Sequence, residues 1–194
     1  MPKPNVREQL IEAGLKTLYR QGFNGSGVQD IVDAARVPKG SFYNHFKSKE
    51  ALAAEALERY WQAGAVRLAV LRDLTVGPVE RLRMYFGALF DAALGPNFEN
   101  GCMIGNFSAE LSDQSPEIRE RLAAIYAAWT RSIESCVREA QNAKRVRLDL
   151  PASAVASFLI NSWEGAVLRA KVERDRSPIV QFEQVVFAGV FTRS

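Results

Sequence analysis

Side chains that can bind nucleic acid are concentrated between Ser26 and Lys49. This stretch contains lysines, hydroxyls, amides, an imidazole and a bare glycine, which can contact phosphates and base edges in a major groove. The candidate DNA contacts are Ser26, Gln29, Arg36, Lys39, Gly40, Ser41, Tyr43, Asn44, His45 and Lys49. The pattern favours a DNA-reading segment. The alternative is the solvated face of an ordinary helical protein.

Two short helices are predicted to position these side chains. Ser26 and Gln29 stand three residues apart, the spacing of a capping box, which predicts a helix beginning at Ser26. Pro38 suits the first turn of a second helix, expected over residues 38–45. The polar candidates would then lie on the outer side of two helices joined by a tight turn.

The sequence resembles the tetracycline-repressor (TetR) family of bacterial transcriptional regulators. The resemblance lies in G-F at 22–23, V-Q-D-I at 28–31 and V-P-K-G-S-F-Y-N-H-F-K-S-K-E at 37–50. It implies an N-terminal three-helix domain with a helix-turn-helix, followed by a larger helical domain for ligand binding and dimerisation. It also implies a repressor that a small molecule releases from its operator.

Carried over by position, the resemblance implies phosphate contacts for Tyr43, His45 and Lys49. It places Lys39, Gly40, Ser41 and Asn44 where the recognition helix meets the bases.

Two positions depart from the family pattern. Ser26-Gly27 stands where paired hydroxyl residues are common, so one phosphate contact would be weaker or supplied by an amide. Arg36 replaces the glycine usual in the turn, where a left-handed conformation costs roughly 1 kcal/mol or more. These departures keep open an alternative, a ligand-binding or interaction protein with a degenerate DNA-binding head.

Charge and composition agree with a DNA-binding head on a globular protein. Residues 1–50 hold 8 Lys and Arg against 5 Asp and Glu, whereas residues 51–194 hold 17 of each. The net charge of +3 therefore lies in the head, which favours a polyanionic partner. No apolar run approaches a membrane span and the N-terminus lacks a signal-peptide pattern, so a cytoplasmic location is expected. Two cysteines without metal spacing and a single histidine predict no metal and no cofactor.

Helical patterns dominate the rest of the chain, which predicts an all-α fold of about nine helices. We expect them over residues 6–21, 26–36, 38–45, 48–72, 78–94, 102–111, 115–143, 151–173 and from 177 onward. The predicted domains are a helix-turn-helix domain at 1–50 and a ligand-binding and dimerisation domain at 51–194.

The last two predicted helices are apolar on more than one face, through residues such as Phe158, Leu168 and Val185. Such helices must bury against something besides their own domain, which favours a homodimer, although burial by earlier helices is the alternative. A dimer reads two half-sites, so the operator is expected to be a near-palindrome.

Cys102 is the candidate sensor residue. Its segment, G-C-x-x-G-N, resembles a TetR subgroup that includes the N-ethylmaleimide-responsive repressor and the acrylate-responsive regulator, which implies that Cys102 reacts with electrophiles. If Cys102 begins a helix, the helix N-terminus would lower its pKa. The alternative is a small buried hydrophobe. Cys136 lies within a long amphipathic helix and is assigned to packing.

A noncovalent effector pocket is a second hypothesis. The ligand-binding candidates are Cys102, Asn106, Trp61, Phe107, Trp129 and Trp163, and the aromatic ones equally fit an ordinary core. An enzyme with Cys102 as nucleophile and His45 as base is disfavoured, because His45 is the only histidine and lies in the DNA-facing helix. We therefore interpret the chain as a ligand-responsive transcriptional regulator.

Overall fold

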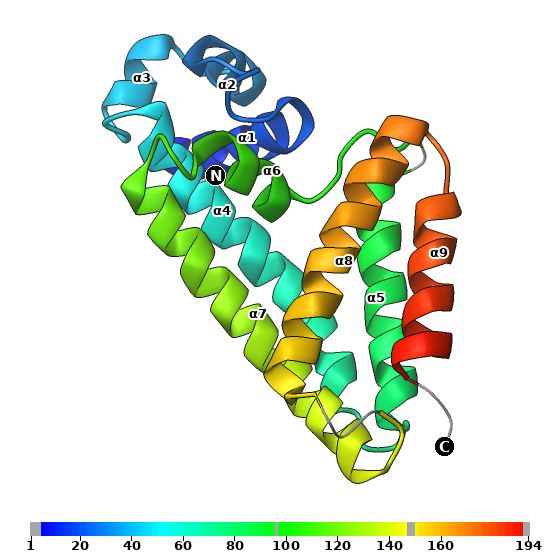
Figure 1. The fold of residues 1–194 in the computed structure, drawn as a ribbon. Coiled ribbons are helices and arrows are strands. Elements are labelled where there is room, and N and C mark those ends of the chain that lie inside the picture. Colours follow the sequence, from blue (N-terminus) through cyan, green and yellow to red (C-terminus); the bar gives the residue numbers. More distant parts are fainter. Residues whose placement is uncertain (1–4, 96, 147–149, 192–194) are drawn as a thin grey trace. The chain divides into compact units, whose positions relative to one another are not determined.

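The computed structural model describes residues 5–95, 97–146 and 150–191, and every regular element over these residues is helical (Figure 1). The expected all-α fold is confirmed, with nine α-helices in the described part of the chain. The elements are α1 Val6–Gln21, α2 Val28–Ala35, α3 Lys39–Tyr43, α4 Lys49–Ala65, the 3-10 helix η1 Val66–Arg72, α5 Pro78–Leu94, α6 Met103–Leu111, α7 Pro116–Asn142, α8 Ala152–Glu173, α9 Ser177–Val185 and the π-helical turn η2 Val186–Val190.

The chain forms two compact units. The first contains the described residues up to Ala63 together with Cys102–Ala123, and the second contains Gly64–Gly101 together with the described residues from Ala124 onward. Helices α4 and α7 each begin in the first unit and end in the second.

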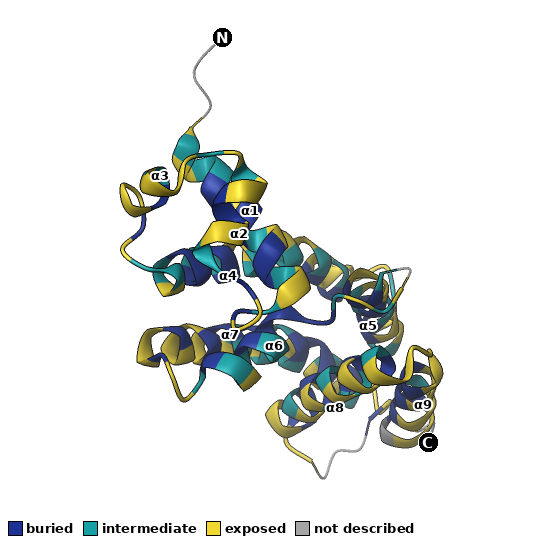
Figure 2. Ribbon diagram, turned by 90° about the horizontal axis from the view of Figure 1, so that it is seen from above, coloured by how far each residue is buried: buried dark blue, intermediate teal, exposed yellow. Residues whose placement is uncertain are grey.

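The core of the first unit is built around α1. Leu10, Ile31, Phe42 and Leu52, from α1, α2, α3 and α4, are completely or almost completely excluded from solvent. Each such side chain contributes roughly 1.5–3 kcal/mol when fully buried. Figure 2 shows buried residues along α1 and α4, whereas much of α3 is exposed. The core therefore needs little of α3 beyond Phe42.

The second unit has an aromatic core. Helix α8 packs against both α5 and α9. Phe90 on α5 lies 5.8 Å from the Trp163 ring on α8 and 5.4 Å from the Phe182 ring on α9, measured between ring centroids. Arg81 is 2% exposed, and it donates to the Leu71 carbonyl at 2.6 Å and pairs with Glu139. These contacts tie α5 to η1 and α7.

Helix boundaries follow the sequence signals where glycine and proline set them. Gly22 is the C-cap of α1, and its φ of 76° is a conformation that glycine adopts with little strain and other residues do not. Helix α5 begins at Pro78 after Gly77, as predicted. Ser48 caps α4 by accepting from the Ala51 amide at 3.2 Å.

Three boundaries differ from the prediction by two residues or more. Helix α2 begins at Val28 rather than Ser26, and α3 ends at Tyr43 rather than at residue 45. The helix expected over 48–72 changes to 3-10 geometry at Val66.

Candidate nucleic-acid interface and effector site

The predicted capping box of α2 is wrong. The N-cap is Gly27, and the Asp30 carboxylate accepts from the Gly27 amide at 2.6 Å. The Ser26 hydroxyl donates instead to the carbonyls of Gly22 and Phe23, at 2.9 and 3.2 Å, and Ser26 is only 5% exposed. Because Ser26 and the Gly27 amide serve the local fold, neither presents a free donor to a phosphate. The short Asp30 side chain reaches the amide three residues back, as the third helical residue of a capping box does.

Helix α3 and the two residues that follow it present the other candidates to solvent. Lys39, Gly40, Tyr43, Asn44 and His45 are exposed, and Ser41 is partly exposed. Tyr43 is 57% exposed although its ring contacts the Phe42 ring at 5.3 Å between centroids. Phe42 and Phe46 provide the buried side, with ring centroids 5.7 Å apart. The polar face of α3 is therefore available for a ligand as large as a DNA duplex.

Arg36 and Gln29 lie at the ends of α2. Arg36 adopts the expected left-handed conformation, with φ 55° and ψ 42°, and its side chain is exposed. The Gln29 amide donates to the Asp33 carboxylate at 2.8 Å, one turn further along α2. Arg36 thus closes the turn between α2 and α3 with its cation toward solvent, where it can meet a phosphate.

Lys49 has a more internal position than the other DNA-contact candidates. Its ammonium donates to the carbonyls of Phe23 and Ser26, at 2.8 and 2.7 Å, and lies 3.9 Å from the centroid of the Phe23 ring. Burial lowers the pKa of Lys49, although the charges of Glu110, Glu50 and Asp30 act in the opposite direction. The lysine at the start of α4 therefore fastens the loop between α1 and α2.

Glu110 on α6 holds the same loop. Its carboxylate accepts from the Asn24 amide at 2.7 Å. A Cβ atom added to Gly22 would lie 2.5 Å from a Glu110 oxygen, so the carboxylate packs directly against the bare glycine backbone. This contact joins residues 86 positions apart. No local sequence pattern signals so long-range a bond, so this role of Glu110 is not predictable from the residues around it.

Phe107 completes the contact between α6 and the head. The rings of Phe23 and Phe107 meet edge to face, with centroids 6.3 Å apart. Phe107 is 0% exposed and Phe23 is 7% exposed. Helix α6 therefore contacts the loop before α2 through one apolar pair and one charge-assisted hydrogen bond.

Cys102 is the N-cap of α6, close to its predicted place, and is 4% exposed. The Tyr60 hydroxyl lies 3.9 Å from its sulfur, and the Tyr60 ring contacts the Tyr19 ring at 5.5 Å between centroids. Burial, followed by the proximity of Cys102, raises the pKa of Tyr60. Tyr60 therefore keeps its proton at neutral pH and can donate it toward the sulfur.

Cys136 has a different environment. It is 1% exposed, and its sulfur lies 3.2 Å from the Pro78 carbonyl oxygen. Burial raises the pKa of Cys136 to about 11, so the thiol stays protonated at neutral pH. This environment agrees with the packing role expected for Cys136.

The remaining ligand candidates belong to both units. In the second unit, Trp129 and Trp163 are each 2% exposed and meet edge to face, with centroids 5.6 Å apart. In the first unit, Trp61 is partly exposed and Phe107 contacts the head loop. The backbone amide of Asn106 donates to the Cys102 carbonyl at 2.9 Å, which forms the first turn of α6.

A helical head with an exposed α3 is typical of a helix-turn-helix transcription regulator. Residues 10–56 match the family described as bacterial regulatory proteins, tetR family. Residues 78–186 match the tetracyclin repressor-like C-terminal domain. The chain belongs to the TetR family, which confirms the resemblance, and it is a DNA-binding transcriptional regulator.

Similar proteins cover almost the whole chain. The HTH-type transcriptional repressor DhaR of Mycobacterium sp. (strain GP1) is 44% identical over 98% of this chain and 94% of that protein. The transcriptional regulator AcuR of Cereibacter sphaeroides is 33% identical over 97% of this chain and 87% of that protein. The crystal structure of the reduced form of NemR from Escherichia coli superposes with a TM-score of 0.81 at 28% identity, covering 91% of this chain and 92% of that one.

Among the described residues, no group of three or more His, Cys, Asp or Glu side chains is placed to hold a metal ion. Within the same residues, no helix has the length and hydropathy needed to cross a bilayer.

Proposed function

We propose that this protein is a homodimeric repressor that binds a near-palindromic operator and is released by a small molecule. Residues 1–50 would form the DNA-binding domain and residues 51–194 the effector and dimerisation domain. The exposed polar face of α3 carries this proposal, because the core of the head uses only Phe42 from that helix. Relatives from Mycobacterium and Escherichia coli are named repressors, which supports repression, and operator binding in a bacterium implies the cytoplasm.

The proposed DNA contacts are the candidate residues that are exposed or partly exposed on the head. They are Gln29, Arg36, Lys39, Gly40, Ser41, Tyr43, Asn44 and His45. Ser26 and Lys49 are assigned instead to holding the loop between α1 and α2, because their polar atoms bond within the head.

A titration tests this function directly. Purified protein is titrated by fluorescence anisotropy against duplexes tiled across the DNA upstream of its own gene, with an unrelated duplex as control. We expect saturable, salt-weakened binding to one near-palindromic duplex. Equal affinity for the unrelated duplex would favour the degenerate-head alternative.

Exposed apolar side chains on the last helices support the dimer. On α8, Phe158, Leu168 and Val172 are 49%, 61% and 76% exposed, at a spacing that places them on one face. Gly165 lies on the same face with open space beside its Cα atom, so a second helix can approach closely there. An apolar stripe of this kind is typical of a self-complementary interface.

The dimer is tested by a matched pair of variants. Leu168→Glu places a charge on the proposed interface, whereas Val66→Glu places one on η1, where the side chain is 73% exposed. Sedimentation velocity at micromolar concentration should give a dimer for the wild type and for Val66→Glu, and a monomer for Leu168→Glu. A monomeric wild type would contradict the dimer.

One proposed route of release is the reaction of Cys102 with an electrophile. The thiolate would add to the activated double bond of a maleimide, forming an S–C bond, and the adjacent carbon would take up a proton from solvent. The thiolate is the reactive form of a cysteine, and the Tyr60 hydroxyl is placed to donate to the Cys102 sulfur. Because Cys102 is 4% exposed, the adduct has no room at the start of α6 and must displace it.

The two cysteines give the control for this route. Cys102→Ser should bind operator like the wild type but resist release by N-ethylmaleimide, while Cys136→Ser should be released like the wild type. Mass spectrometry of each variant would locate the adduct. Normal release of Cys102→Ser would remove thiol sensing from the account.

A further inference from the structure

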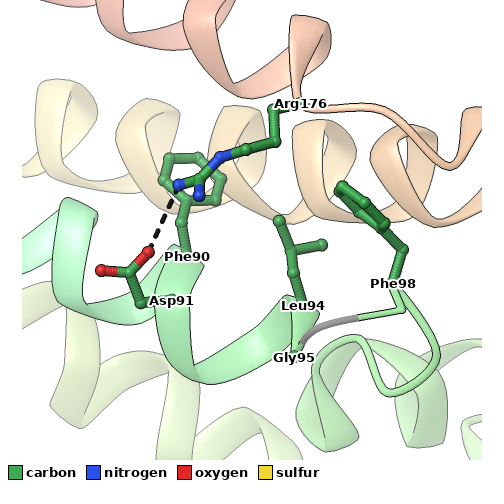
Figure 3. A pocket seen from close by; sticks show the side chains of 6 residues that line it. All are labelled: Phe90, Asp91, Leu94, Gly95, Phe98 and Arg176. Carbon is green, nitrogen blue, oxygen red and sulfur yellow. Dashed lines mark hydrogen bonds and ion pairs between the residues drawn. The ribbon is translucent and has the colours of Figure 1, made fainter.

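The second unit contains a cavity of about 300 Å³ that includes neither cysteine (Figure 3). Helix α5 provides Phe90, Asp91 and Leu94, the following loop provides Phe98, and the turn before α9 provides Arg176. Phe90 and Leu94 are 1% and 4% exposed, so the floor of the cavity is apolar and belongs to the core. A small space with an apolar floor and few polar groups is typical of a ligand site.

The loop wall of this cavity is held in a strained conformation. Phe98 has a φ of 55°, which is uncommon for a bulky residue. Arg174, on the α8 side, donates to the carbonyls of Asn97 and Phe98 at 2.6 and 3.1 Å. The Gly101 amide donates to the Ala93 carbonyl at 2.9 Å and ties the end of the loop to α5. Strain that neighbouring bonds maintain in this way is a recurrent feature of ligand sites.

An exposed ion pair between Arg176 and Asp91 lies at the mouth of the cavity. Figure 3 shows Arg176 reaching toward Asp91, while Leu94 and Phe98 extend into the same space. The Arg176–Asp91 pair is 3.3 Å long, and its side chains are 63% and 72% exposed. An exposed pair of this kind contributes little to stability. Another anion can therefore replace Asp91 as the partner of Arg176 at little cost in free energy, because the Asp91 carboxylate remains solvated.

We propose that this cavity binds a small organic anion with an apolar body. Its carboxylate replaces Asp91 as the partner of Arg176, in the paired geometry that a guanidinium favours. Its apolar part lies against Phe90, Leu94 and Phe98. A cation fits less well, because it would have to displace the Arg176 guanidinium from Asp91.

The cavity has a consequence for regulation that rests on the proposed function. Phe98 lies in the loop that runs directly into Cys102 and α6. Helix α6 carries Phe107 and Glu110, which contact the loop of the head. An anion that binds one arrangement of the 97–101 loop better than another would shift the position of α6 and oppose operator binding.

Calorimetry on the full-length protein without DNA tests the binding site, with benzoate and hexanoate as anionic probes. Benzyl alcohol and hexanol are the neutral controls of matched size. We expect at least one anion to bind and its alcohol to bind about tenfold more weakly or worse, a difference of about 1.4 kcal/mol. Absence of heat from both anions at millimolar concentration, or equal binding of acid and alcohol, would overturn the proposal.

Three variants sharpen this test. Arg176→Gln should weaken anion binding about tenfold, and Asp91→Asn should strengthen it severalfold because the competing carboxylate is gone. Arg169→Gln is the matched control, since Arg169 is exposed near the same end of α8 and pairs with Glu173. Binding unchanged in Arg176→Gln, or weakened in Asp91→Asn, would contradict the assigned role of Arg176.

A separate operator titration, with and without the anion, tests the regulatory consequence. Anion binding together with weaker operator affinity supports both the site and its regulatory role. Anion binding with unchanged operator affinity retains the site and overturns its regulatory role. If no operator is bound at all, the proposed function fails, whereas the calorimetric result for the cavity stands.

Discussion

Two neighbouring polar segments of the head have opposite environments. On α3 and in the two residues that follow it, the side chains of Lys39, Asn44 and His45 are exposed and make no hydrogen bond or ion pair within the described part of the chain. In the loop between α1 and α2, Ser26 and Asn24 bond to the surrounding protein through side chain or backbone. Polarity alone therefore does not separate the proposed DNA contacts from residues that hold the head in place. The hydrogen-bond partners of each polar atom make this distinction.

The largest effect is expected on α3. The double variant Lys39→Ala with Asn44→Ala removes two exposed groups that the fold does not use, so its melting temperature should equal that of the wild type. Loss of two base-edge contacts at about 1–3 kcal/mol each should weaken operator binding by roughly a hundredfold or more. Anisotropy titration and thermal unfolding measure the two quantities. Operator affinity close to that of the wild type would remove α3 as the reader.

An intermediate effect is expected from the loop. Glu110→Ala removes the acceptor of the Asn24 amide and leaves a donor without its partner, at a cost of about 1–3 kcal/mol. Operator affinity should fall about tenfold although Glu110 lies on α6 and not on the reading helix.

Glu110→Gln keeps an acceptor oxygen and should restore most of this affinity. Asp113→Ala, an exposed change two residues beyond the end of α6, is the control. Glu110→Ala with unchanged affinity would show that the contact does not position the head.

A smaller effect on DNA binding, with a clear effect on stability, is expected at Gly22. Gly22→Ala adds a Cβ atom 2.5 Å from the Glu110 carboxylate at a φ of 76°. The unfavourable conformation alone costs roughly 1–2 kcal/mol, and the carboxylate must move. Thermal unfolding should show a melting temperature lower by several degrees, with a partial loss of operator affinity. An unchanged melting temperature would contradict a close contact between the Glu110 carboxylate and Gly22.

The sequence predicts the fold well because many boundaries are set by single residues. Gly22 ends α1, Ser48 caps α4, and Gly77-Pro78 begins α5. The predicted start of α2 is wrong because the Ser26 hydroxyl bonds to the preceding loop, while the Asp30 carboxylate accepts from the amide of the N-cap, Gly27.

The candidate site is less predictable. The exposed side chains of α3 follow from the spacing of Phe42 and Phe46, which assigns the buried side. The anchoring roles of Lys49 and Glu110 do not, because their partners lie 23 to 86 residues away. The positive charge of Lys49 also predicts a DNA contact when the hydrogen-bond partners of its ammonium are unknown.

The salt dependence of operator binding compares Lys39 and Lys49 most directly. Each lysine is replaced by glutamine, and operator affinity is measured across a range of salt concentrations. Lys39→Gln should weaken binding and lower the magnitude of the salt slope by about one, because its exposed ammonium is proposed to lie against the DNA. Lys49→Gln should weaken binding with the slope unchanged, because its ammonium is bonded to the carbonyls of Phe23 and Ser26. An equal loss of slope in Lys49→Gln would place that lysine on a phosphate and contradict the division between reading and positioning residues.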